Sequence, residues 1–162
     1  MKKHLKRLDQ VYDSIPTYFI TTCTDKRGKL LATKAVHELL LEEWSDARER
    51  HGWLVGSYVV MPDHVHFFAR PSDPGTSKPL SKFIGTWKQW TSKRFRREVD
   101  PGFGALPEEA VLWQPGFFDH VLRSSESYSE KWDYVRNNPV RAGLVGDADD
   151  WPYSGVIHDL TL

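Results

Sequence analysis

The sequence predicts a single α+β domain, in which helices pack on a sheet that contains antiparallel strands. Its 162 residues are enough for one domain with a hydrophobic core and few for two. Residues 53–61 and 64–70 are apolar, strand-like runs, and the tight turn at Pro62 between them favours antiparallel pairing. Helical periodicity follows Thr33, Pro79 and Ser125. No repeat or long linker divides the chain, so we expect one domain over residues 1–162.

The first third of the chain carries signals for the ends of its elements. Residues 1–13 are polar and basic, and we expect them to form a flexible arm. Residues 17–22 have the pattern of a strand, and residues 25–28 have that of a turn. Thr33 is a suitable N-cap for a helix, and Gly52 is expected to end that helix. Its apolar face would consist of Val36, Leu39, Leu40, Trp44 and Ala47.

Two more helices and one more strand are predicted after residue 76. Ser77 and Pro79 are expected to open a helix with the apolar stripe Leu80, Phe83, Ile84 and Trp87. Residues 100–110 are rich in glycine, proline and acidic residues and predict a loop, and residues 112–122 predict a strand with an irregular start. Ser124 or Ser125 would cap the last helix and Pro139 would end it, with Tyr128, Trp132 and Val135 on its apolar side.

Two histidines, His64 and His66, begin the second of the paired strands. Side chains alternate along a strand, so both imidazoles point to one face and form half of a metal site. A solvent-exposed pair is the alternative, but the flanking apolar residues favour a strand of the core sheet. A histidine-triad enzyme would need histidine where Phe68 stands, and an amidohydrolase barrel needs about 250 residues. The remaining interpretation of the histidine pair is a small metal nuclease whose nucleophile lies on another element.

The charge is uneven although the formal net charge is zero. From residue 75 to residue 97 the chain has basic residues and no acid, and this favours phosphate contacts along the second helix. The candidates for binding DNA are Lys82, Lys88, Lys93, Arg94, Arg96 and Arg97, and Trp90 could stack on bases. A single cysteine, Cys23, and the lack of long apolar runs suggest a soluble, cytoplasmic protein that does not enter a membrane.

Three other side chains are candidates for the site. Tyr134 and Asn138 are spaced i, i+4 on the last predicted helix, so they would share a face outside its apolar stripe. A helical tyrosine is more often a packing residue, but a metal site with two histidines still needs a nucleophile and an oxygen ligand. His120 is either a further site residue or a partly buried histidine that bonds to the backbone.

Four motifs in order resemble the REP-associated tyrosine transposases over nearly the whole chain. They are Met61-Pro-Asp-His-Val-His66, Leu112-Trp-Gln-Pro-Gly-Phe-Phe-Asp-His120, Tyr134-Val-Arg-Asn-Asn-Pro-Val-Arg-Ala-Gly-Leu-Val145 and Trp151-Pro-Tyr-Ser154. That family belongs to the single-tyrosine HUH nucleases, alongside the small insertion-sequence transposases. The resemblance implies a ferredoxin-like α+β sandwich, with the histidine pair on a central antiparallel sheet and the tyrosine on a helix beside it.

The resemblance also implies roles for single residues. His64, His66 and Asn138 would bind a divalent metal, Mg²⁺ or Mn²⁺, and Tyr134 would be the nucleophile. Asp63 stands where many relatives have asparagine. The metal would polarise a scissile phosphate as a Lewis acid, and Tyr134 would attack it to give a 5′-phosphotyrosine and a free 3′-hydroxyl.

The substrate implied by the resemblance is single-stranded DNA beside a hairpin formed by a REP-like palindrome. The expected activity is that of a metal-dependent endonuclease and strand transferase, acting as a monomer or a homodimer. A repeat-DNA-binding protein with dormant chemistry is the first alternative. A hydrolytic metalloenzyme for a small substrate is the second, and it leaves the acid-free basic segment unexplained.

Overall fold

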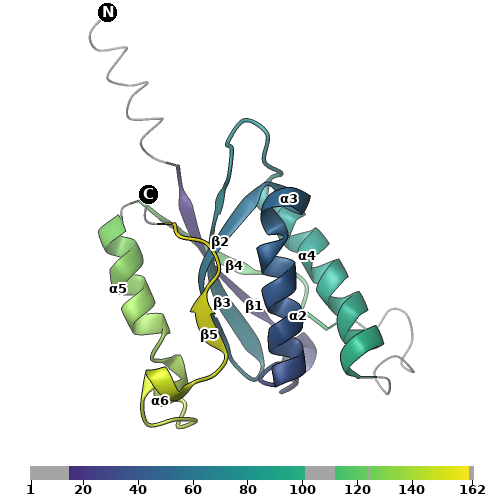
Figure 1. Ribbon diagram of the computed structural model, residues 1–162, viewed down its shortest axis with the longest axis vertical. Coiled ribbons are helices and arrows are strands. Elements are labelled where there is room, and N and C mark those ends of the chain that lie inside the picture. The colour runs from purple at the N-terminus through teal and green to yellow at the C-terminus, as the bar shows by residue number, and fades with distance from the viewer. Residues whose placement is uncertain (1–14, 101–111, 124, 161–162) are drawn as a thin grey trace, which may run out of the picture.

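A five-stranded antiparallel sheet with helices on both faces forms the fold (Figure 1). The computed structural model describes residues 15–100, 112–123 and 125–160. The strands are β1 (Thr17–Cys23), β2 (Trp53–Val60), β3 (His64–Pro71), β4 (Phe118–Leu122) and β5 (Ser154–Val156). Their order across the sheet is β4-β1-β3-β2-β5. The predicted α+β class and the antiparallel pairing of β2 with β3 are therefore confirmed.

The helices lie in two groups, one on each side of the sheet (Figure 1). On one side are α2 (Lys34–Ser45), α3 (Ala47–His51) and α4 (Leu80–Arg94), and on the other are α5 (Ser125–Val135) and α6 (Asn138–Arg141). Shorter turns are η1 (Asp25–Arg27), η2 (Phe95–Val99) and η4 (Ala148–Asp150). None of the helices in these ranges is both long and apolar enough to cross a membrane.

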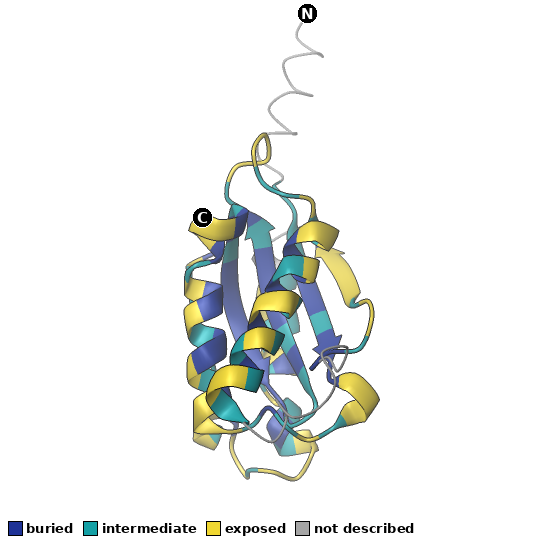
Figure 2. Cartoon of the chain, turned by 90° about the vertical axis from the view of Figure 1, so that its right-hand side faces the viewer, coloured by how far each residue is buried: buried dark blue, intermediate teal, exposed yellow. Residues whose placement is uncertain are grey.

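Strand alternation divides the core between the two faces of the sheet. Ile20, Val65 and Phe67 point to the side of α2 and α4, where they join a large buried cluster that includes Trp44 and Trp87. Phe19, Phe68, Val59 and Leu122 point to the other side, where they join Val135 of α5. The central strands β1, β2 and β3 are largely buried between these layers, whereas β4 and the outward faces of the helices are exposed (Figure 2). The apolar residues of β3 thus divide between two packed layers, with Val65, Phe67 and Ala69 in one and Phe68 in the other.

The ends of the first helical segment follow the predicted capping signals. The Thr33 hydroxyl accepts a hydrogen bond from the Val36 N–H at 3.2 Å. Gly52 has a left-handed backbone with φ of 74°, and its N–H bonds to the carbonyls of Ala47 and Arg48. The segment is nevertheless two helices, because the backbone changes direction at Asp46, where α2 ends and α3 begins.

Two predicted helix boundaries were wrong. Ser77 does not cap α4, since its hydroxyl donates to the Gly52 carbonyl and so ties the loop after β3 to the end of α3. Pro139 does not end the last helix, because α5 already ends at Val135 and Pro139 lies in the first turn of α6. Proline is tolerated there because the first turn of a helix needs no N–H donor. The arm at residues 1–13, the loop from residue 101 onward and the Ser124 or Ser125 cap fall outside what the structure describes.

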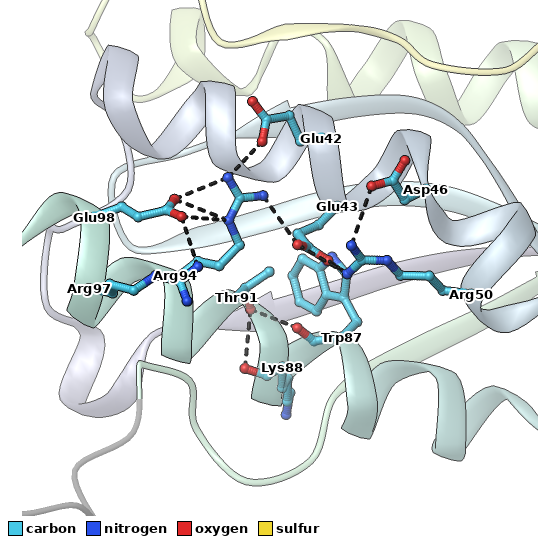
Figure 3. A network of polar contacts seen from close by, with 10 residues as sticks. All are labelled: Glu42, Glu43, Asp46, Arg50, Trp87, Lys88, Thr91, Arg94, Arg97 and Glu98. Carbon is cyan, nitrogen blue, oxygen red and sulfur yellow. Dashed lines mark hydrogen bonds and ion pairs between the residues drawn. The ribbon is translucent and has the colours of Figure 1, made fainter.

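A buried carboxylate connects α2, α3 and α4 through a network of ion pairs (Figure 3). The Glu43 side chain is only 2% exposed and bonds to Arg50 at 3.1 Å and to Arg94 at 3.2 Å. Arg94 also reaches Glu42 at 2.6 Å and Glu98 at 3.0 Å. Burial lowers the pKa of the Arg94 guanidinium, but its bonds to three carboxylates outweigh that effect and raise the pKa. The Arg94 side chain therefore belongs to the packing between helices.

Replacement of Arg94 by methionine should destabilise the fold, because it leaves Glu43 buried with one cation fewer. We expect the free energy of unfolding in a urea titration to fall by about 2 to 3 kcal/mol. The matched control is Arg97→Met on the exposed side of η2, where the arginine side chain is 73% exposed and the loss should stay under about 1 kcal/mol. Equal losses for the two variants would contradict the structural role of Arg94.

His51 should make the stability of the fold depend on pH. Its ring is buried against Phe83, and neither ring nitrogen has a hydrogen-bond partner. Burial, together with the nearby Lys78 and Arg50 charges, lowers its pKa to about 4. As the pH falls, His51 therefore takes up its proton in the unfolded chain before it does so in the folded protein. The contribution of His51 to the free energy of unfolding is complete above about pH 6.5 and is lost as the pH falls from there toward 4.

The measurement is the free energy of unfolding at several pH values between 7 and 5. His51→Leu should flatten the pH dependence by at most about 1.4 kcal/mol per pH unit. Val121→Thr, at an exposed position of β4, is the control and should leave the slope as it is in the wild type, because neither side chain titrates. A wild-type slope in the His51→Leu variant would show that another group carries the pH dependence.

Candidate active site

His64 and His66 lie side by side on the face of β3 that is turned toward α5. Their rings are 4.8 Å apart between centroids and nearly perpendicular, at 78°. Val65, between them in sequence, is fully buried on the opposite face. His66 pairs in register with Thr21 of β1 and Val59 of β2, and it stacks on Phe19 at 5.2 Å. The fold therefore places both imidazoles on one surface, as the spacing predicts.

A hydrogen bond at Nδ1 orients each imidazole. Nδ1 of His64 lies 2.7 Å from Oδ1 of Asp63, and Nδ1 of His66 lies 2.8 Å from the hydroxyl of Thr21. A carboxylate can only accept, so neutral His64 carries its proton on Nδ1 and its lone pair on Nε2. Thr21 can accept from Nδ1 of His66 in the same way. Metal-binding histidines are typically held like this, with the second nitrogen bonded to an oxygen.

Asp63 is itself held by Arg27 of η1, the turn that follows β1, so the hydrogen bonds that orient His64 extend to this turn. Oδ2 of Asp63 accepts from Nε of Arg27 at 3.0 Å. Burial raises the pKa of Asp63, but its bonds to His64 and Arg27 outweigh burial and lower the pKa, so the group is a carboxylate at neutral pH. Lys26 and Arg27 both have positive φ, of 53° and 56°. Non-glycine residues rarely adopt this conformation, and such strain often accompanies functional sites.

The pKa of His66 is strongly lowered. Burial is the main cause, and together with the charges of His64, Lys131 and Arg141 it lowers the pKa to about 3, so the ring is neutral at neutral pH. A neutral imidazole keeps the lone pair that a metal ion needs. The same shift shows that Lys131 of α5 and Arg141 of α6 lie near the histidine pair.

Tyr134 lies in the last turn of α5, and its side chain is exposed. The Arg141 guanidinium lies over its ring, 3.9 Å from the centroid. Arg141 also donates from Nη2 to Oδ1 of Asn138 at 3.0 Å. Tyr134 and Asn138 were predicted to lie on one continuous helix, and this was wrong. The chain turns at residues 136–137, so Tyr134 lies on α5 and Asn138 on α6. Arg141 contacts both residues and lies near His66.

The donor set suits a divalent metal only if Asn138 takes part. Within residues 15–100, 112–123 and 125–160, no three His, Cys, Asp or Glu side chains gather that could hold a metal ion. His64 and His66 supply two nitrogens, and the candidate for a third donor that the sequence predicts is the Asn138 amide oxygen, which accepts a hydrogen bond from Arg141. Two imidazoles and an oxygen fit Mn²⁺ better than Mg²⁺, which prefers oxygen ligands.

His120 is exposed on β4, so the interpretation as a partly buried histidine was wrong. It pairs in register with Phe19, and directly paired residues share a face of the sheet. His120 is therefore on the same face as His66, one strand beyond Phe19. Its exposure at the sheet edge leaves it accessible to a ligand.

The basic residues of the second predicted helix differ in their surroundings. Lys82 and Lys93 are exposed, whereas Lys88 bonds to the Gln114 and Gly116 carbonyls. Arg94 and Arg97 are paired with acids that come from α2 and η2. Lys88, Trp90, Lys93 and Arg96 line a groove of about 1010 Å³ beside residues 113–117. The segment without acids in sequence is thus partly neutralised in space.

Sequence reasoning missed four residues around the histidine pair. Thr21 and Arg27 become visible only through strand pairing and the conformation of η1. Lys131 and Arg141 lie outside the basic segment of residues 75–97. Lys131 precedes Tyr134 by three residues, a spacing that makes them neighbours on a helix, and Arg141 belongs to the third motif, where its charge was given no role.

The fold thus combines an antiparallel sheet that carries a histidine pair on one face with a helix, α5, that lies on the same side and carries Tyr134. The family "Transposase IS200 like" matches residues 14–138. The chain belongs to this family.

The chain is also similar to one relative in sequence and to one solved structure in fold. The chain is 25% identical over 144 residues to a REP-associated tyrosine transposase of Escherichia coli (strain K12), with 88% of this chain and 77% of the relative covered. The structure of a REP-associated tyrosine transposase bound to a REP hairpin superposes with a TM-score of 0.67. It is 22% identical, and the match covers 91% of this chain and 90% of that one. The likeness in structure shows that the two share the fold.

Loss of the oxygen atoms that orient the imidazoles should weaken metal binding. We expect Thr21→Val and Asp63→Leu each to lower the affinity for Mn²⁺ by about tenfold, measured by isothermal titration calorimetry. Asp63→Asn should lose less, because an amide oxygen can still accept from Nδ1 of His64. Asp119→Leu, at an exposed position of β4, is the control. Unchanged affinity in Thr21→Val and Asp63→Leu would show that these bonds do not prepare a metal site.

Proposed function

We propose that this protein is a metal-dependent single-stranded DNA endonuclease and strand transferase that acts at hairpins formed by REP-like palindromes. The observation that carries the proposal is the constellation around Arg141. This residue contacts Tyr134 and Asn138 and lies near a pair of oriented imidazoles, of which His66 is neutral. The hairpin substrate is supported by the relative that was solved with a REP hairpin.

Tyr134 is the proposed nucleophile. Its hydroxyl oxygen would form a bond to the scissile phosphorus as the bond from phosphorus to the 3′-oxygen breaks, and the 3′-oxygen would take up a proton as the phenol loses one. The products are a 5′-phosphotyrosine and a free 3′-hydroxyl. Because the covalent ester retains the energy of the phosphodiester, a 3′-hydroxyl can reverse the step and join strands without ATP. Exposure of Tyr134 leaves room for a strand of DNA.

His64, His66 and Asn138 are the proposed metal ligands. A divalent ion held there would act as a Lewis acid toward the phosphate. The protein's own contribution is to fix the donors beforehand, through Asp63 for His64 and Thr21 for His66. To bind the metal, Oδ1 of Asn138 would first have to give up its hydrogen bond from Arg141.

DNA beyond the scissile phosphate would follow α4. Lys88, Lys93 and Arg96 in the groove, with Lys82 and Arg97 outside it, are the proposed phosphate contacts, and Trp90 is 45% exposed for stacking on a base. Arg94 is better explained as part of the network around Glu43. The protein would act as a monomer or a homodimer.

The test is covalent capture of single-stranded DNA from the repeats that flank the gene. Wild-type protein with Mn²⁺ should give a protein–DNA adduct, visible as a shifted band on a denaturing gel, and Tyr134→Phe should abolish it. His64→Ala and His66→Ala should reduce the adduct by at least about 100-fold. The matched control is Tyr153→Phe, because Tyr153 packs against His37 of α2 and the core on the opposite face of the sheet, and its loss should leave the adduct intact.

Two results would count against this function. An adduct that persists in Tyr134→Phe would place the nucleophile elsewhere. Hairpin binding that needs no metal and yields no adduct under any condition would instead indicate a repeat-DNA-binding protein with dormant chemistry.

A further inference from the structure

Two cations, Lys131 of α5 and Arg141 of α6, lie near the histidine pair without a carboxylate partner in the described part of the chain. The Lys131 ammonium lies 4.7 Å from the centroid of the Phe19 ring, and the Arg141 guanidinium lies 3.9 Å from that of Tyr134. Phe19 stacks on His66, so both cations rest on rings that belong to the site or touch it.

The contrast with other cations of the fold is informative. Arg27, Arg50, Arg94 and Arg136 each form an ion pair with at least one acid. Arg136 is close to Arg141 in sequence, yet it pairs with Asp149. A cation that packs only on an aromatic face keeps most of its N–H donors for another acceptor. Arg141 uses one donor on Asn138 and retains the rest of its fork.

Both cations also lie beside Tyr134. Lys131 precedes it by three residues on α5, a spacing that makes the two neighbours on the helix surface, and the Arg141 guanidinium lies over its ring. The Tyr134 side chain is 63% exposed, so the two cations border an accessible part of the surface. An anion placed between the two side chains would complete the charge balance.

We propose that Lys131 and Arg141 form the anion-binding site that holds a phosphodiester of single-stranded DNA beside Tyr134. The inference rests on the proposed function and deepens it, because it assigns the phosphate at the reacting centre to α5 and α6 and leaves the rest of the strand to α4. Lys131 supplies a point charge and Arg141 a planar fork that matches two phosphate oxygens.

The experiment is an NMR titration of the full chain with inorganic phosphate and, separately, with the dinucleotide d(TpT), at low ionic strength. The signals of Tyr134, Arg141 and His66 should shift with each probe. Lys131→Gln and Arg141→Gln should each raise the dissociation constant by about fivefold. Arg136→Gln, the matched control, should change it by less than about twofold. Circular dichroism checks that each variant is folded.

Three outcomes would overturn the proposal. Affinities that do not change in Lys131→Gln and Arg141→Gln would remove the site, and shifts confined to α4 would move the phosphate to the groove. Dependence on the pair for inorganic phosphate but not for d(TpT) would show a site for free phosphate and not for a diester.

Tyr134→Phe separates this proposal from the proposed function. The variant keeps the ring under Arg141 and should bind both probes as the wild type does, although it cannot form an adduct. If phosphate binding depends on Lys131 and Arg141 but the protein never forms an adduct, the anion site is supported and the nuclease function is refuted. If the adduct forms at the wild-type rate in Lys131→Gln and Arg141→Gln, the nuclease function is supported and the anion site is refuted.

Discussion

Strand β3 is packed on both faces, and this constraint determines where the site can be. Val65 and Phe67 are buried under α2 and α4, and Phe68 is buried under α5. A shift of one residue in the register would turn the histidines into the large aromatic cluster and two buried apolar side chains out of it. Burial of unpartnered imidazoles and loss of that packing would both oppose the shift. The hydrophobic core thus fixes the direction of His64 and His66.

Much of the fold could be predicted because its signals are local. The turn at Pro62, the Thr33 cap and the left-handed Gly52 each act over a few residues, and all three appear as expected. The errors at Ser77 and Pro139 arose where a local preference met a tertiary contact or a second helix. The Ser77 hydroxyl donates a hydrogen bond to the Gly52 carbonyl and does not cap a helix N-terminus. Pro139 fits the start of α6 as well as it would fit the end of α5.

The site was harder to predict than the fold, because its parts are distant in sequence. Spacing alone placed His64 and His66 on one face, but Thr21 is 45 residues from its partner His66, and Arg27 is 36 residues from Asp63. The charge pattern was misleading for a related reason. The basic run along α4 contains no acid in sequence, yet Glu42 and Glu43 of α2 reach Arg94 across the helix interface. A sequence shows the charges of a helix but not those that pack against it.

The two sets of cations therefore have different consequences for a phosphate. Around Arg94 the charges are already balanced, so a phosphate there would have to compete with three carboxylates. Around His66 the cations Lys131 and Arg141 rest on aromatic rings, and their potential opposes both protonation of the imidazole and the arrival of a metal cation. A phosphate bound between them would reduce that opposition, since it brings negative charge to the same place. Binding of the anion and binding of the metal would then favour each other, and by linkage the effect is equal in both directions.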